Sequence, residues 1–169
     1  DTVVRIFEEK PFFIVPRGQP EADAEDVTFP GPDGLTLRGC YLPARGPRKG
    51  VLLFGLEFGS NRWAAAPYCA ALRDAGYDVF AWEPRNQGDS DKDASYQPLQ
   101  WVTDRDRADG RAAVAYLKSR PDAPAAGVGF FGVSKGGSVG LLLAAEDQWL
   151  TCVATDGAYA AVTRERRLK

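Results

Sequence analysis

The sequence lacks two residue types, histidine and methionine. Without histidine, these 169 residues cannot by themselves complete a catalytic triad of serine, histidine and an acid. Because the first residue is aspartate, the sequence does not begin at a translation start. We therefore expect a preceding segment such as a signal peptide, a membrane anchor or a tag, and the cellular compartment stays open.

Cysteine is scarce and long apolar runs are missing. Cys40, Cys69 and Cys152 are far apart and odd in number, which suits neither a disulfide framework nor a zinc site, so we expect three buried or half-buried thiols. No apolar run approaches the roughly 18 residues that span a bilayer. The net charge of −2 is spread along the chain and gives no reason to expect a nucleic-acid partner. We expect a soluble globular segment without a membrane span.

The chain divides into a leader and a core. Residues 1–26 are rich in charge and proline, and we predict a short helix followed by an extended arm that packs on the domain. Residues 27–169 alternate short apolar runs with helical patterns. The predicted strands are 27–30, 35–42, 51–54, 77–82, 127–133 and 150–154, and the predicted helices are 61–75, 104–118 and 135–145. This order predicts two initial strands followed by βα units that build a parallel sheet.

One motif carries most of the chemistry. Gly132-Val133-Ser134-Lys135-Gly136 lies directly after a predicted buried strand and directly before a predicted helix. G-x-S-x-G in that context is typical of a nucleophilic serine on a sharp turn, with flanking glycines that leave room for the neighbouring strand and helix. A glycine-rich turn that binds nothing, or binds a phosphate, is the plainer alternative.

Together with this motif, two further segments make the chain resemble the α/β-hydrolase superfamily over about residues 27–160. Phe54-Gly55-Leu56-Glu57-Phe58-Gly59-Ser60 lies where that family carries an oxyanion loop, and Glu83-Pro84-Arg85-Asn86-Gln87-Gly88-Asp89-Ser90 looks like the family's turn after the fourth strand. The resemblance implies an α/β-hydrolase fold: a mostly parallel sheet with helices on both faces, truncated after about the sixth strand. The family's C-terminal strands and lid would then be missing from residues 27–169.

The resemblance also implies roles for particular residues. Ser134 would be the nucleophile, and the backbone N–H groups of Lys135 and Phe58 would form the oxyanion hole. The loop departs from the family pattern, because Leu56 stands where histidine is common and Glu57 where glycine is common. We expect the carboxylate of Glu57 to turn away and pair with Arg62 or Arg85, and Arg85 to clamp neighbouring loops.

The remaining triad members are not evident. Asp156 at a strand end is a possible acid, although capping the turn or packing beneath the serine is the simpler expectation. Lys135 should not form a Ser–Lys dyad, because a side chain at that position points away from the side where the base lies. The family's histidine follows a later strand. We therefore expect a continuation or a C-terminal fragment of the same protein to supply it; a naturally short non-catalytic chain and a truncated one are the alternatives.

The function predicted from the sequence is a serine hydrolase that cleaves an ester or related acyl bond of a small-molecule substrate through an acyl-enzyme on Ser134. No metal or organic cofactor is implied. A non-catalytic pseudo-hydrolase that binds a ligand or partner is the rival from another class. An acyl-CoA thioesterase or acyltransferase is a further alternative, since Gly-x-Ser-Lys-Gly resembles the equivalent segment of acyl-CoA thioesterases, and a peptidase stays open.

Overall fold

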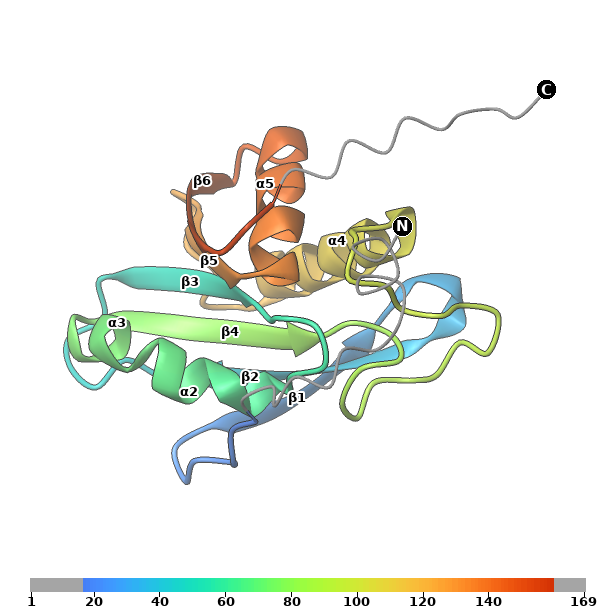
Figure 1. Ribbon diagram of the computed structural model, residues 1–169. Helices are drawn as coiled ribbons and strands as arrows, with labels where there is room; N and C mark the ends of the chain where they lie inside the picture. The colour runs from blue at the N-terminus through green and yellow to red at the C-terminus, as the bar shows by residue number, and fades with distance from the viewer. Residues whose placement is uncertain (1–16, 160–169) are drawn as a thin grey trace.

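The computed structural model describes residues 17–159, and these residues form a twisted mixed sheet covered by helices (Figure 1). The strands lie in the order β1-β2-β4-β3-β5-β6. β2 pairs antiparallel with both β1 and β4, whereas β4, β3, β5 and β6 pair parallel to one another. The strand bounds are β1 Glu25–Pro30, β2 Thr36–Leu42, β3 Gly50–Gly55, β4 Tyr77–Glu83, β5 Val128–Val133 and β6 Leu150–Asp156.

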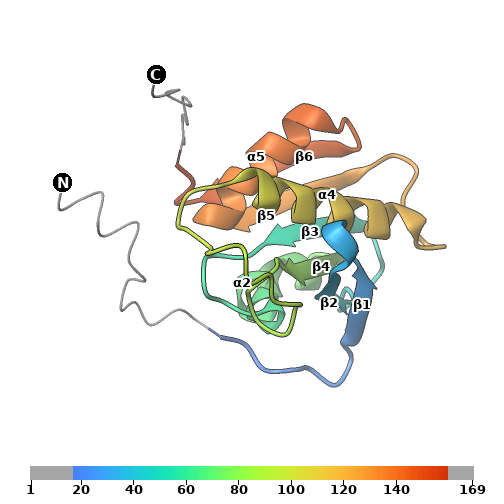
Figure 2. The same cartoon turned by 90° about the vertical axis from the view of Figure 1, so that its right-hand side faces the viewer.

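Helices cover both faces of the sheet (Figures 1 and 2). The short elements η2 (Arg62–Ala64), α2 (Ala65–Tyr68) and α3 (Ala70–Asp74) lie on one face, and α4 (Asp104–Ser119) and α5 (Lys135–Glu146) lie on the other. A single 3₁₀ turn, η1 (Pro32–Gly34), joins β1 to β2. The predicted fold class is therefore confirmed: a mostly parallel sheet between two helical layers.

Each face of the sheet has its own apolar core. The larger core joins the sheet to α4 and α5 through side chains such as Phe80, Phe130, Leu117 and Leu143. The smaller core joins the other face to η2, α2 and α3. Continuous apolar strands such as β3 and β5 can contribute to both cores, because alternate side chains point to opposite faces. This double burial holds the central strands rigid, and the candidate site lies at their carboxyl ends.

The predicted helix over 61–75 is wrong as a single element. The structure has three short pieces instead, and residues 62–64 form a 3₁₀ turn. Pro67 has no N–H to donate to the carbonyl of Trp63, which explains why the first turn is not α-helical. A second break falls at Cys69, whose φ of −104° and ψ of 11° leave the helical range.

The described part of the leader, residues 17–24, contains no helix or strand and packs on the domain. The N–H of Gly18 donates to Oδ1 of Asn61 at 2.9 Å, and Glu21 and Asp23 both pair with the buried guanidinium of Arg73. The predicted short helix and the rest of the arm, in residues 1–16, lie outside the described residues.

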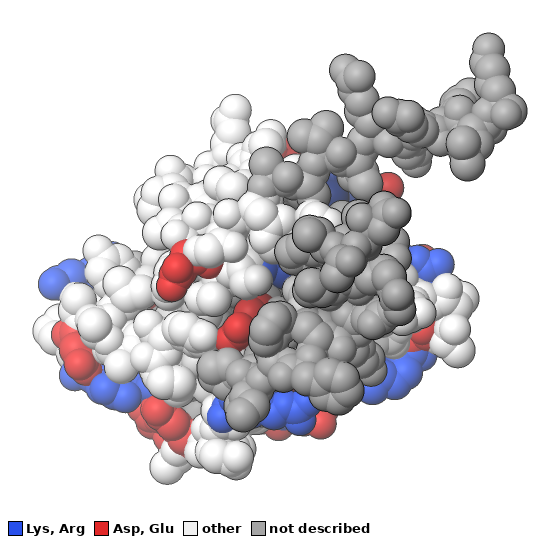
Figure 3. All heavy atoms as spheres, in the orientation of Figure 1, with Lys and Arg blue, Asp and Glu red and all other residues white. Residues whose placement is uncertain are grey.

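At the other side of the sheet, β6 is the outermost of the strands that the structure describes. Leu150 is buried, but most of the strand is exposed, including Cys152, so the expectation of three buried or half-buried thiols is wrong for that one. Leu141 and Leu142 of α5 are also exposed. In Figure 3, this part of the surface carries few charges, whereas blue and red side chains alternate along the opposite rim. Between residues 17 and 159, no helix is both long and apolar enough to cross a membrane.

Candidate active site

Ser134 lies on the turn between β5 and α5 with an unusual backbone conformation. Its φ is 52° and its ψ is −122°, which falls outside the regions that ordinary L-residues adopt. The N–H of Ser134 donates to the carbonyl of Asp156 at 2.7 Å, and its carbonyl accepts from the N–H of Ser138. Both ends of this strained residue are therefore held by neighbouring structure, which is what such strain requires to persist.

The glycines of the motif allow the turn to pack tightly. A Cβ atom on Gly136 would lie 2.2 Å from the carbonyl oxygen of Gly55, and one on Gly132 would lie 2.6 Å from the nitrogen of Gly137. The close approach at Gly136 brings the first turn of α5 against the backbone that leaves β3. The sharp turn predicted at Ser134 is therefore present, and it adjoins the loop after β3.

That loop, Leu56–Gly59, is held by the side chain of Gln87. The amide Nε2 of Gln87 donates to the carbonyl of Glu57 at 3.1 Å, and its Oε1 accepts from the N–H of Gly59 at 3.2 Å. The N–H of Ser60 also donates to the carbonyl of Glu57, which closes a β-turn with Gly59 at a φ of 83°. A positive φ at the third residue is typical of a type II turn and favours glycine.

The carboxylate of Glu57 does not pair with Arg62 or Arg85, so that prediction is wrong. The hydroxyl of Tyr68 in α2 donates to Oε1 of Glu57 at 2.8 Å instead. Burial, the hydrogen bond to Glu57 and the nearby carboxylates of Glu57 and Asp156 raise the pKa of Tyr68 to about 12. Tyr68 therefore stays protonated, as a donor to Glu57, over the whole neutral range.

The two arginines are already paired with other carboxylates. Arg62 is 4% exposed and bonds to the buried Glu83, and also to Asp26 and Asp89. Arg85 makes a close pair with Asp109, in which both side chains are almost completely buried. Arg85 thus clamps the turn after β4 to α4, as the sequence predicted. Because both guanidinium groups are paired with other carboxylates, neither binds Glu57.

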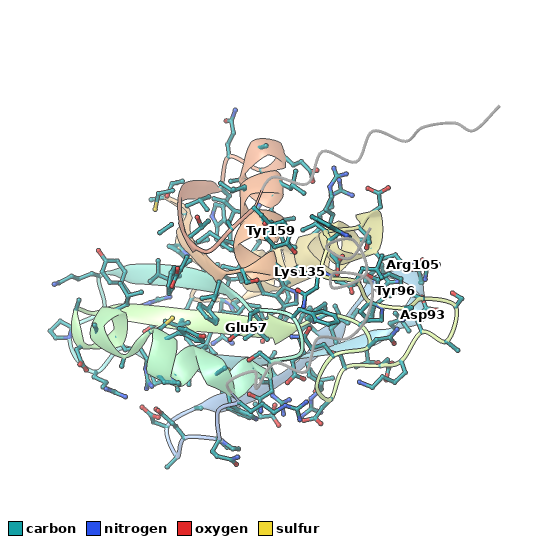
Figure 4. All side chains as sticks on the ribbon, viewed as in Figure 1. Glu57, Asp93, Tyr96, Arg105, Lys135 and Tyr159 are labelled. Carbon is teal, nitrogen blue, oxygen red and sulfur yellow. The ribbon has the colours of Figure 1, made fainter. Side chains whose placement is uncertain are left out.

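Lys135 is a buried lysine directly after Ser134. Its Nζ lies 2.8 Å from Oδ1 of Asp106 and donates to the carbonyl of Leu99, and only 6% of the residue is exposed. Burial lowers the pKa of Lys135, and Asp106 opposes that shift. The side chain is committed to these partners, which agrees with the expectation that it does not act as a base toward Ser134. Figure 4 shows Lys135 at the start of α5, with Tyr96 and Arg105 to its right in that view.

The two predicted oxyanion donors belong to neighbouring residues. The Nζ of Lys135 lies 5.5 Å from the centre of the Phe58 ring, a cation–π distance. The N–H of Lys135 belongs to the first turn of α5, where backbone N–H groups have no acceptor within the helix and the helix dipole favours negative charge. The oxyanion-hole role of the Lys135 and Phe58 N–H groups stays a prediction.

Asp156 is the last residue of β6, and its side chain is exposed. Its backbone carbonyl accepts from the N–H of Ser134 and holds that turn, whereas its exposed carboxylate does not pack beneath it, so the expectation of packing beneath the serine is wrong. A role for Asp156 as the acid of a triad stays a prediction.

Comparisons with known proteins show which enzymes the chain is similar to. Residues 111–169 match the family described as "BAAT / Acyl-CoA thioester hydrolase C terminal". The chain is 31% identical to acyl-coenzyme A thioesterase 1 of Mus musculus over 133 residues, which cover 77% of this chain and 29% of the relative. It is 32% identical to a polyketide transferase of Gibberella fujikuroi over 130 residues, 75% of this chain and 38% of that protein.

Solved structures show the same fold. The α/β hydrolase GrgF from Penicillium superposes with a TM-score of 0.65 at 28% identity, covering 78% of this chain and 45% of that one. An esterase of Pyrococcus furiosus superposes with a TM-score of 0.69 at 22% identity, covering 89% and 58%. The chain has the α/β-hydrolase fold and belongs to the α/β-hydrolase superfamily. It spans less than a third of the length of the mouse thioesterase.

Three contacts at the site were not predicted from the sequence: the Gln87 clamp, the Tyr68–Glu57 hydrogen bond and the Lys135–Asp106 pair. The Lys135–Asp106 pair left a signal, since a lysine in the middle of an otherwise small and apolar stretch needs a buried partner. The Gln87 and Tyr68 contacts join residues 30 and 11 positions apart in different elements, and no local sequence pattern indicates them.

Proposed function

We propose that this chain carries the nucleophile and the oxyanion hole of an enzyme that cleaves acyl thioesters or esters through an acyl-enzyme on Ser134. The observation that carries the proposal is the backbone of Ser134, a non-glycine residue held at a φ of 52° between a buried strand and a helix. Such strain is kept where it positions a reacting group. We infer that a serine in that conformation presents its hydroxyl clear of the sheet edge.

In the proposed reaction, the hydroxyl oxygen of Ser134 attacks the acyl carbonyl carbon, and its proton passes to a histidine outside this chain. The tetrahedral oxyanion accepts hydrogen bonds from the N–H groups of Lys135 and Phe58. Collapse expels the thiolate or alkoxide, which takes the proton from the histidine. Water then attacks the acyl-serine by the same route and releases the acid.

Thioesters are the substrate class that we favour among acyl bonds. The support is the likeness to acyl-CoA thioesterases across three quarters of the chain, together with the C-terminal thioester hydrolase family match. A thiolate is a better leaving group than an alkoxide, so the site need not protonate it as early. Ester cleavage is the expected side activity.

The test uses the intact protein that contains this chain. Wild type, Ser134→Ala and Ser119→Ala are compared for release of free thiol from acyl-CoA substrates of increasing chain length. Ser119 is an exposed serine at the end of α4 and serves as the matched control. We expect a loss of at least about a thousandfold in kcat for Ser134→Ala and no change for Ser119→Ala. Equal activity of wild type and Ser134→Ala would overturn the proposal.

Acyl transfer is a second candidate, because polyketide transferases are similar to this chain at about the same identity as the thioesterases. Transfer and hydrolysis share the acyl-enzyme and differ only in whether water or another nucleophile resolves it. Adding a primary alcohol or amine to the thiol-release assay separates them: a transferase forms the acylated acceptor and uses water slowly.

A further inference from the structure

We propose that Gln87 is the positioning residue of the oxyanion hole: its side-chain amide orients the peptide group that carries the Phe58 N–H. This inference rests on the proposed function, since it concerns the geometry of the same site. Gln87 lies in the turn after β4, 29 residues away from Phe58 along the chain. It would touch neither substrate nor nucleophile and would act only through the loop.

The argument begins with the peptide bond between Glu57 and Phe58. The carbonyl of Glu57 and the N–H of Phe58 belong to the same planar group, and in a trans peptide they point in opposite directions. Gln87 Nε2 and the N–H of Ser60 both donate to that carbonyl. Fixing the carbonyl toward Gln87 therefore fixes the Phe58 N–H away from Gln87.

The second hydrogen bond of the amide prevents the loop from rotating about this first contact. Oε1 of Gln87 accepts from the N–H of Gly59, the residue after Phe58. The clamp thus holds one group on each side of Phe58 and leaves the intervening N–H unused by Gln87. A neutral amide fits this task, because it offers one donor and one acceptor side by side.

The clamp is itself anchored. The N–H of Gln87 donates to the carbonyl of Pro84, and its carbonyl accepts from the N–H of Ser90, so both sides of its backbone are fixed in the turn. Only 9% of Gln87 is exposed. It also lines a small cavity that is bordered by Leu56, Gly136 and Lys135. Gln87 therefore sits where the loop after β3 meets the first turn of α5, between the two segments that carry the proposed donors.

This arrangement compensates for the residue at position 57. The family pattern that the loop resembles has glycine there, whereas Glu57 adds a side chain with a negative charge. Tyr68 binds the carboxylate, and Gln87 binds the backbone of the same residue. The two contacts hold Glu57 against α2 and the turn after β4, which leaves the Phe58 N–H as the group available to an oxyanion.

The experiment compares Gln87→Met and Gln87→Glu with wild type in the intact protein, using thiol release from an acyl-CoA. Methionine keeps the volume and removes both hydrogen bonds. A deprotonated glutamate can accept from Gly59 but repels the carbonyl of Glu57, whereas a protonated glutamate supplies both a donor and an acceptor. Gln148→Met makes the same chemical change at an exposed glutamine beyond the far end of α5 and is the matched control.

For Gln87→Met we expect kcat to fall about 10- to 100-fold with KM changed less than about twofold, since misplacing a donor costs less than removing one. For Gln87→Glu we expect activity relative to wild type at each pH to rise as pH falls from about 8 to 5.5, as the carboxyl gains its proton. Gln148→Met should match wild type. A merely structural role would lower the fraction of folded protein without this pH-dependent rescue.

Two outcomes would overturn the inference. One is a wild-type kcat in Gln87→Met, and the other is a Gln87→Glu to wild-type ratio that does not change with pH. A wild-type protein that cleaves neither thioesters nor esters contradicts the proposed function itself, so the two failures are distinguishable.

Discussion

The buried pair of Lys135 and Asp106 gives the most informative stability prediction. Oδ1 of Asp106 contacts Lys135, while Oδ2 accepts from the N–H and hydroxyl of Thr103 and from the hydroxyl of Tyr96. Asp106→Asn can keep an oxygen on the side of Thr103, where it completes the cap of α4. It must then turn its NH₂ group toward the ammonium of Lys135, which leaves a buried cation without a counter-charge.

Breaking one side of a buried ion pair typically costs about 3–5 kcal/mol, and we expect Asp106→Asn to lie in that range because both side chains are at most 7% exposed. Lys135→Met should cost less, since Asp106 keeps three donors on its other oxygen. The double variant should cost less than the sum of the two single ones. Lys118→Met, which breaks an exposed pair with Asp147, is the control and should cost about 1 kcal/mol or less.

The pH dependence follows from the lysine. Burial lowers the pKa of Lys135 in the folded protein, so the unfolded chain binds more protons and stability falls as pH drops below the lysine's ordinary pKa. Removing Asp106 lowers that folded pKa further, because Asp106 was raising it. The loss in free energy of unfolding caused by Asp106→Asn should therefore shrink as pH rises between the Lys135 pKa of the folded variant and the Lys135 pKa of folded wild type.

The assay is urea unfolding of the intact protein at pH 7 and pH 9.5, with the free energy of unfolding extrapolated to water. We expect Asp106→Asn to lower the free energy of unfolding, relative to wild type, by less at pH 9.5 than at pH 7. A deficit at pH 7 no larger than that of Lys118→Met would refute the reasoning, because the pair would then behave as a surface contact.

Two further predictions concern the scaffold of the site. Gly136→Ala should cost several kcal/mol and abolish activity, because its Cβ would meet backbone atoms of Gly55 at 2.2 Å, and folded yield with residual thiol release will check this. Arg85→Met should lower the free energy of unfolding by about 3–5 kcal/mol by leaving the buried Asp109 without a counter-charge, while KM of the folded fraction stays unchanged; a changed KM would indicate that Arg85 contacts substrate.

The sheet could be predicted because its evidence is local. β3, β4 and β5 are short apolar runs that stop at glycine, proline or polar residues, and each was expected within one or two residues of its observed bounds. The start of α4 was predicted at residue 104, as observed, and the structure adds a capping box in which the N–H of Thr103 donates to Oδ2 of Asp106. The helix after β3 was mispredicted since its alanines favour helix everywhere, while Pro67 acts on a carbonyl four residues earlier.

At the site, the sequence located the serine turn but not the contacts that support it. The expectation for Glu57 failed because other carboxylates bind the two arginines: Glu83 pairs with Arg62, and Asp109 pairs with Arg85. Tyr68 carries no charge, so a search for opposite charges could not propose it. Such partners depend on where distant elements meet, and only the fold determines that.

The central claim is that Ser134 is a nucleophile, and the most direct measurement is to map an active-site adduct. The intact protein is treated with a fluorophosphonate and digested with trypsin, and the peptide spanning residues 119–135 is sequenced by mass spectrometry. The account predicts one phosphonyl group on Ser134, formed in wild type and absent from Ser134→Ala. A label on Ser119, a label on another peptide, or an unmodified serine in a protein that still cleaves thioesters would contradict it.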